Sequence, residues 1–322
     1  MSLPPVFKTL RLPVIAAPLF IISNPDLLIT ECKAGVMGSV PALNARSIDM
    51  LNQWLTRITK ELDRYNQENP QLPAAPYAVN QIVHRSNDRL MQDVELCVKH
   101  KVPVVITSLG ARAEVNDAIH SYGGITLHDV INNSFAKKAI EKGADGLIAV
   151  AAGAGGHAGG LSPFALVQEI RQWFDGPLIL SGAIANGKSI LAAQAMGADL
   201  AYIGSPFIAT KEANAIDSYK RMIIECGAED IIYSDYFTGV WGNYLKPSLI
   251  ANGLDPDNLQ DSSGATMNFG EGESDKTKKW KDIWGSGQGI GTIKDVVAAA
   301  DRISDLKVQY EAAKDYLKAA YG

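Results

Sequence analysis

Short apolar runs alternate with amphipathic stretches along the first two thirds of the chain. The runs carry hydrophobic residues at consecutive positions instead of alternate ones, which is typical of strands buried on both faces. Eight runs predict strands, at Val14–Phe20, Gly35–Val40, Tyr77–Val83, Val102–Ser108, Ile125–Val130, Gly146–Ala152, Pro177–Gly182 and Leu200–Gly204.

The stretches between these runs have apolar residues at helical spacing. They predict helices at Asp26–Cys32, Ser47–Tyr65, Asp88–Lys99, Ala111–His120, Asn133–Lys142, Pro163–Phe174, Gly187–Met196 and Lys211–Cys226. Eight strand–helix units fit an α/β fold, the closed (β/α)8 TIM barrel, whose usual length is about 250 residues. An open, doubly wound parallel sheet is the alternative.

The regular alternation stops after the eighth unit. The segment Tyr233–Gly291 carries many aromatic residues and a polar stretch, Asp255–Asp275, and it precedes a final amphipathic helix expected at Ile293–Ala319. Long irregular segments in compact domains are usually functional or disordered. We therefore expect a lid over the barrel mouth, with a structural cap as the alternative. The expected division is a barrel of residues 1–230 and 287–322 and a lid or insertion of residues 231–286.

Composition narrows the class of partner. The 322 residues are 47% hydrophobic and carry a formal net charge of −5. Nucleic acids and anionic membranes attract concentrated positive charge, so neither is an expected partner. Small-molecule chemistry is favoured instead.

The cysteines and the N-terminal apolar run bear on the cell compartment. Cys32, Cys97 and Cys226 are an odd, widely spaced set that indicates neither a disulfide framework nor a zinc site. The run Leu12–Ile22 has the length of a secretory core, but its prolines and the lack of a small-residue cleavage site favour a buried first strand. A reducing cytoplasm is the expected location.

Candidate chemistry lies at the C-terminal strand ends, where barrel enzymes place their reactive groups. Gly153–Gly160 follows the sixth strand and holds one histidine, His157, among glycines that let a ligand approach the backbone. Asn80 ends the third strand, although such a residue is more often a turn former. His128, beside Asp129 in the fifth strand, is either a cofactor contact or an ordinary core histidine. No metal-ligand spacing is present, so no metal site is expected.

Two further loops indicate a phosphate. Ser181–Ser189 follows the seventh strand and Gly204–Pro206 the eighth, and both are rich in small residues. Exposed N–H groups and helix starts make an anion site, and these loops often hold a phosphate in barrels. After the first strand, Ala17–Leu19 offers backbone groups and an apolar face to a flat ring, unless it is only a core turn. A phosphate-bearing cofactor explains these loops together.

A dinucleotide fingerprint competes with this interpretation. Gly153–Ala158 matches G-x-G-x-x-A, but the next strand, which should end in an acidic residue for the ribose, ends in Ser181-Gly182. The match also falls at the sixth unit instead of the first. No G-x-S-x-G elbow follows a strand, so a serine hydrolase is not indicated either.

Several motifs together resemble one family, the nitronate monooxygenases, formerly called 2-nitropropane dioxygenases. They are Gly153-Ala-Gly-Gly-His-Ala-Gly159, Leu180-Ser-Gly-Ala183, Gly197-Ala-Asp199, Ile203-Gly-Ser-Pro-Phe207, Ala209-Thr-Lys-Glu212 and Trp284-Gly-Ser-Gly-Gln-Gly289. The likeness covers essentially the whole chain. The histidine–glycine motif is shared with flavin-dependent enoyl-acyl-carrier-protein reductases and NADH:quinone reductases.

The resemblance implies a TIM barrel that holds FMN at its C-terminal face, with His157 as catalytic base. Together with His128 from the strand-end pattern, the expected cofactor contacts are Ala17, Pro18, Leu19, Asn80, Gly155, Gly156, Ser181, Gly182, Ala183, Gly204 and Ser205. Some members have lysine at Asp129 and glycine at Ala183, and threonine is common at Ser205. A cationic contact to the cofactor is therefore missing here or supplied elsewhere.

The implied reaction is oxidation of alkyl nitronates with O2. For a neutral nitroalkane, His157 would first take the α-proton. An FMN-dependent NAD(P)H:quinone or enoyl-thioester reductase is the alternative within the superfamily. A flavin-free barrel that binds a sugar phosphate or purine nucleotide is a third possibility. The substrate is left open, and so is the oligomeric state, for which a homodimer is one candidate.

Overall fold

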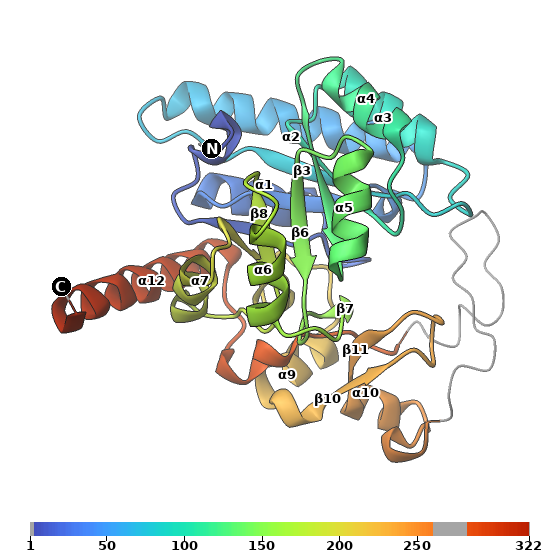
Figure 1. Ribbon diagram of the computed structural model, residues 1–322, viewed down its shortest axis with the longest axis vertical. Coiled ribbons are helices and arrows are strands. Elements are labelled where there is room, and N and C mark those ends of the chain that lie inside the picture. The colour runs from blue at the N-terminus through green and yellow to red at the C-terminus, as the bar shows by residue number, and fades with distance from the viewer. Residues whose placement is uncertain (1–2, 260–281, 322) are drawn as a thin grey trace.

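Eight parallel strands form a closed barrel in the computed structural model, which describes residues 3–259 and 282–321. The hydrogen-bonded order is β1-β9-β8-β6-β5-β4-β3-β2, and a bridge between Ile15 and Met37 joins the first strand to the last. The expected TIM barrel is confirmed (Figure 1). The strands are β1 (Val14–Ala16), β2 (Gly38–Pro41), β3 (Tyr77–Ile82), β4 (Val104–Ser108), β5 (Ile125–Val130), β6 (Gly146–Val150), β8 (Leu178–Ser181) and β9 (Leu200–Ile203).

Helices surround the barrel in the expected order. They are α1 (Pro25–Ala34), α2 (Ile48–Glu68), α3 (Leu90–Lys99), α4 (Ala113–His120), α5 (Asn133–Glu141), α6 (Pro163–Arg171), α7 (Gly187–Ala195), α8 (Ser205–Ile208), α9 (Asp217–Glu225), α10 (Lys246–Ala251) and α12 (Ala299–Tyr321). Short 3-10 turns are η1 (Pro5–Phe7), η2 (Ala42–Asn44), η3 (Ala228–Asp230), η4 (Pro256–Asn258) and η5 (Gln288–Thr292).

Two helix starts differ from the expectation. The helix after the eighth strand begins at Asp217 instead of Lys211, and the last helix begins at Ala299 instead of Ile293. A parallel bridge joins Thr210 to Val297, so the segments that precede these two helices are tied to each other. Residues 211–213 form bends instead of the expected first turn of helix.

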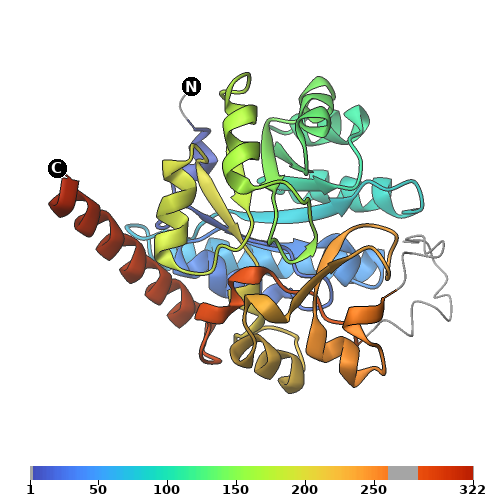
Figure 2. The same cartoon turned by 60° about the horizontal axis from the view of Figure 1, so that its bottom comes forward.

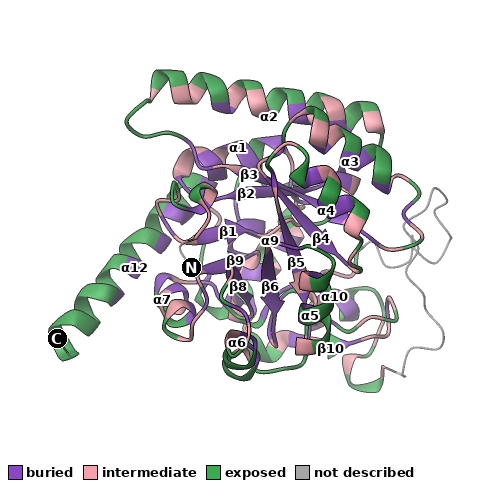
Figure 3. Cartoon of the chain, turned by 45° about the horizontal axis from the view of Figure 1, so that its top comes forward, coloured by how far each residue is buried: buried purple, intermediate pink, exposed green. Residues whose placement is uncertain are grey.

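The barrel interior changes from apolar to polar toward the C-terminal strand ends. Ile15, Met37, Ile106 and Leu127 belong to the buried cluster inside the barrel. Side chains alternate across a strand, so the residue two positions after an inward one also points inward. By this rule the polar residues Asn80, Ser108, Asp129, Ser181 and Tyr202 point inward at the mouth, together with the apolar Val150. Figure 3 shows the barrel strands buried and the outer faces of the helices exposed.

A second, small sheet covers this mouth. Its order is β10 (Ile231–Ser234), β11 (Gly242–Leu245) and β7 (Gly156–His157), all antiparallel. Figures 1 and 2 show it at the barrel end toward which β6 runs. The hairpin that follows the eighth unit thus pairs with the loop of the sixth. The division at residues 231–286 stays a prediction, and most of the polar stretch, residues 260–275, lies outside the described residues.

The last helix packs against the barrel layer and then leaves it. α12 contacts α1 and α7, whereas its C-terminal part projects away from the body (Figures 1 and 2). None of the helices within the described ranges is long and apolar enough to cross a membrane.

Candidate functional site

The sheet pairing holds His157 in place at the barrel mouth. His157 is paired with Gly242 of the lid hairpin, and the next N–H, of Ala158, donates to the carbonyl of Trp241 over 3.0 Å. Gly156 has a φ of +66°, which favours glycine, and this turn lets the chain leave the sixth loop as a strand. Part of the glycine-rich sequence is therefore needed for a backbone turn, and the approach of a ligand to it stays a prediction.

The imidazole of His157 contacts the lid through one hydroxyl. Its Nε2 lies 3.1 Å from Oγ1 of Thr238, and that hydroxyl donates to the carbonyl of Val240 over 3.1 Å. The same hydroxyl also hydrogen-bonds with the Tyr244 side chain. When its proton goes to Val240, Oγ1 accepts an Nε2–H of His157, and the lone pair is then on Nδ1, for which the described residues supply no hydrogen bond.

Burial keeps this ring neutral. Removal from water disfavours the imidazolium and lowers the pKa of His157 from 6.5 to about 4. A neutral imidazole with an unprotonated Nδ1 can accept a proton near pH 7. It is a poor proton donor at the same pH.

A chain of polar groups lies along the inner wall of the mouth. The Asn80 amide donates to Oγ of Ser108 over 2.8 Å and to the carbonyl of Ile106 over 3.1 Å. Ser108 in turn donates to Oδ2 of Asp129 over 2.6 Å. Burial raises the pKa of Asp129 to about 7, although the Ser108 hydrogen bond acts in the opposite direction.

His128 does not join the other predicted cofactor contacts. It lies between Leu127 and Asp129 on the strand, so its side chain is on the outer face of the barrel wall. There it is buried, with Nδ1 2.6 Å from Oγ1 of Thr107, and burial lowers its pKa to about 4. In this register Asp129, its neighbour, takes the inward position, and the cofactor contact expected of His128 stays a prediction.

The loops after β8 and β9 meet the sixth loop as expected, but a further segment joins them. Ala183 has a φ of +52°, and its N–H donates to the carbonyl of Gly153 over 3.1 Å. Ser205 Oγ accepts from the N–H of Gly287 over 2.9 Å. A Cβ on Gly155 would lie 2.7 Å from the Gly287 nitrogen, so only glycine allows this close approach.

Other predicted contacts occupy the same end of the barrel. The N–H of Ala17 donates to Ile203, so the first loop lies beside the eighth strand. A Cβ on Gly204 would be 3.1 Å from Leu19, which brings this apolar side chain to the eighth loop. The N–H of Leu19 is committed to Ser23, so the first loop offers its apolar side chains more than its N–H groups.

Three functional candidates did not emerge from the sequence. Thr238 lies in the lid, whose residues could not be matched to a motif. Ser108 and Tyr202 end apolar strands, and their only signal is register: each continues the inward row of its strand. Since both follow apolar inward residues, a polar layer at the mouth could have been inferred from alternation.

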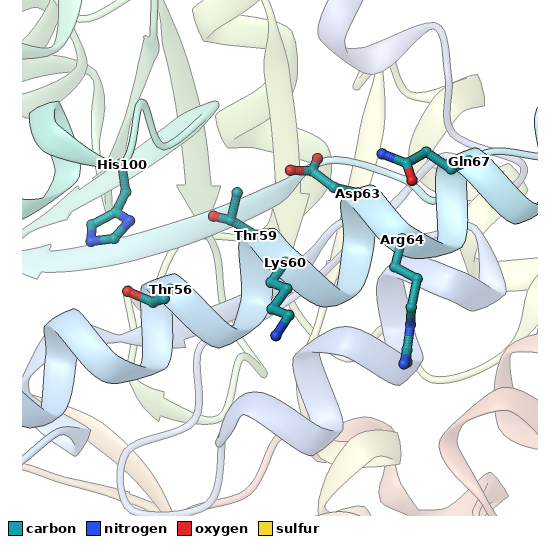
Figure 4. A pocket seen from close by; sticks show the side chains of 7 residues that line it. All are labelled: Thr56, Thr59, Lys60, Asp63, Arg64, Gln67 and His100. Carbon is teal, nitrogen blue, oxygen red and sulfur yellow. The ribbon is translucent and has the colours of Figure 1, made fainter.

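A surface hollow lies away from this mouth. It is lined by exposed polar residues of α2 and by His100, on the outer side of the helical layer (Figure 4). The side chains in this view do not converge on a common point. Across residues 3–259 and 282–321, no group of three His, Cys, Asp or Glu side chains could hold a metal ion.

Comparisons with known proteins agree with this geometry. A nitronate monooxygenase from Neurospora crassa is 24% identical over 360 residues, covering 97% of this chain and 92% of the relative. A second relative, from Rhodococcus jostii, is 22% identical and covers 84% of this chain and 73% of the relative. Its name is that of an octahydro-indene-carboxyl-CoA dehydrogenase. A nitroalkane oxidase structure from Streptomyces ansochromogenes superposes with a TM-score of 0.82 at 21% identity, covering 97% and 99% of the two chains.

The family assignment rests on a match over most of the chain. The family described as nitronate monooxygenase matches residues 5–307. Membership makes the protein an oxidoreductase that acts on small molecules and supports flavin-dependent oxidation of nitronates in general terms. The chain belongs to the nitronate monooxygenase family.

Proposed function

We propose that this protein is an FMN-dependent monooxygenase that oxidises alkyl nitronates with O2, and that it also accepts neutral nitroalkanes by removing their α-proton. The observation that carries this proposal is the state of His157. The ring is neutral, its Nε2 proton is held by Thr238, and its Nδ1 is free to act as a base.

The residues at the mouth suit a flavin. Asp129 Oδ1 and the Tyr202 hydroxyl are buried and lack partners within the described ranges, and the neighbouring loops are rich in small residues. We expect Asn80 and Asp129 to face the ring, and the loops at Ser181–Ala183 and Gly204–Ser205 to hold the phosphate. FMN, when bound, supplies the electron transfer and the reaction with oxygen.

The protein residues act on the substrate proton. Nδ1 of His157 accepts the α-proton of a nitroalkane, and the Thr238 contact fixes the tautomer that makes this atom basic. The lid hairpin lies against His157, and burial lowers the pKa of this ring, which keeps the base unprotonated. A nitronate, which has already lost this proton, needs no base.

A substitution at His157 tests the assignment. We expect His157→Ala to lower kcat/KM for a neutral nitroalkane by about 10²- to 10⁴-fold, the usual contribution of general base catalysis. Turnover of the preformed nitronate should change little. His100→Ala, on the outer helical layer, is a matched control. An equal loss on both substrates would contradict the base assignment.

The reductase alternative is tested on the same protein. A reductase would use His157 as an orienting or proton-donating group. With a pKa of about 4, His157 is almost wholly neutral near pH 7, so little of the proton-donating imidazolium is present. Under anaerobic conditions we expect the flavin absorbance to bleach with nitronate and to persist with NADH or NADPH. Rapid bleaching by NAD(P)H would instead assign the protein to the reductases.

A further inference from the structure

Two polar groups at the barrel mouth have unfilled hydrogen-bonding capacity. Oδ1 of Asp129 and the hydroxyl of Tyr202 are both buried, and neither has a hydrogen-bond partner among the residues that the structure describes. Tyr202 as a whole is only 7% exposed. A buried polar atom without a partner costs about 1–3 kcal/mol, so native proteins normally supply a protein group, a water or a ligand.

Both groups belong to the inward rows of their strands. Tyr202 follows the inward Leu200 on β9, and Asp129 follows the inward Leu127 on β5. Burial is the larger cause of the raised pKa of Tyr202, and the charge of Asp129 adds to it. The two groups are not hydrogen-bonded to each other, so each is left for another partner at the mouth.

The chemistry of the pair selects its occupant. The phenol of Tyr202 stays protonated and donates one hydrogen bond. The second oxygen of Asp129, Oδ2, already accepts from Ser108, so a protonated carboxyl carries its hydrogen on Oδ1. Two donors that face the same space require a ligand edge with acceptor atoms, such as carbonyl oxygens or ring nitrogens.

We propose that Asp129 and Tyr202 form a donor pair at the barrel mouth that binds the acceptor edge of the flavin ring, with Asp129 as a neutral carboxylic acid. This inference rests on the proposed function, because it takes flavin as the cofactor. It adds two binding residues to those expected from the sequence.

The surroundings of Asp129 support the neutral form. Burial is the main cause of its raised pKa, and no cation contributes to it. The groups on the adjacent strands are uncharged: Ser108 and Asn80 are neutral amino acids, and the histidines of this region have lowered pKa values. A ring placed over the carboxyl would exclude more water and favour protonation further.

Flavin affinity measured against pH tests the pair. FMN is added to the flavin-free protein between pH 5.5 and 8.5, and binding is followed by quenching of its fluorescence. With a pKa of about 7 for Asp129, a requirement for the neutral acid weakens binding by up to about 30-fold at pH 8.5 relative to the plateau below pH 6. The Asp129→Asn amide keeps a donor at all pH values. We therefore expect it to bind FMN as well as the wild type at pH 5.5 and at least tenfold more tightly at pH 8.5.

Two further variants complete the design. Tyr202→Phe should weaken FMN binding by about 2- to 12-fold at every pH, the effect of one hydrogen bond. Asp301→Asn and Tyr316→Phe make the same chemical changes at exposed sites of α12 and should leave the pH profile unchanged. Because the phosphate of FMN titrates in this range, the comparison is between variants and not between pH values alone.

The outcomes separate the two proposals. If the wild type and Asp129→Asn bind FMN with the same pH profile, or if Tyr202→Phe has no effect, the donor pair is overturned and water fills this space. The proposed function survives that result. If no variant binds FMN and none oxidises nitronates, the proposed function fails, and the inference fails with it.

Discussion

Replacing Thr238 by valine removes the hydroxyl that holds His157 while keeping the shape of the side chain. This hydroxyl lies against Nε2 of His157 and hydrogen-bonds with the Tyr244 side chain. Within its own turn it donates to the carbonyl of Val240 and accepts from the N–H of Val240 over 3.3 Å. In Thr238→Val, the Nε2–H of this partly buried ring would lose its acceptor. The alternative tautomer, with the proton on Nδ1, would then become more populated.

The size of the effect follows from this lost partner. A buried donor without an acceptor costs about 1–3 kcal/mol, and a factor of ten in rate corresponds to about 1.4 kcal/mol. We expect kcat/KM for a neutral nitroalkane to fall by about 5- to 150-fold, less than in His157→Ala. Steady-state oxygen consumption measures it, with the preformed nitronate as second substrate and Thr238→Ser as the variant that restores the hydroxyl.

Two patterns would refute the reasoning. If Thr238→Val oxidises nitroalkanes at the wild-type rate, the contact does not set the tautomer of His157. If nitroalkane and nitronate turnover fall together, the hydroxyl supports the lid fold instead of the base. Thermal unfolding of the same variants distinguishes that structural role, since only a lid defect should lower Tm in parallel with both rates.

Two other predictions concern pH and backbone strain. The pKa of His157 is lowered to about 4, so this residue loses its basic form only well below neutrality. We expect kcat/KM for a nitroalkane, measured from initial rates, to be level between pH 6 and 8 and to fall only toward pH 4. A midpoint near 6.5 would show that the surroundings do not lower the pKa of this ring. Ala183 has a φ of +52° at an exposed position, so Ala183→Gly should change the free energy of unfolding by less than about 1 kcal/mol, because relief of strain offsets the greater freedom of the unfolded chain. Ala183→Val places a β-branched residue in that conformation and should destabilise by about 1–2 kcal/mol in urea unfolding, and equal stability of the two variants would contradict the strain argument.

The barrel could be predicted because its signals are local. A strand such as Val104–Ser108 is apolar on both faces, and the helix after it has apolar residues at helical spacing. Each strand–helix unit carries this information within about 30 residues, and eight repeats define the architecture. The closure of the barrel depends on pairing between distant parts of the chain, such as β1 with β9.

The site was predicted less completely because it depends on side-chain direction and long-range pairing. His128 and Asp129 are adjacent, and a shift of one residue in strand register exchanges which of them faces the mouth. The apolar neighbours on both faces hide that register in a strand buried on both sides. The contact between His157 and Thr238 joins residues 81 positions apart, so no local pattern contains it.

Two titratable groups of the mouth, His157 and Asp129, illustrate how one physical cause can serve two chemical needs. Burial disfavours charge on both His157 and Asp129, which lowers the pKa of the imidazole and raises that of the carboxyl. A base must be free of its proton to act on a nitroalkane, and a carboxyl must keep its proton to donate to a flavin edge. A neutral His157 and a protonated Asp129 meet both conditions near or below pH 7. The protonated Asp129 also adds no negative charge that would repel an anionic nitronate, whereas its ionisation above pH 7 would introduce one.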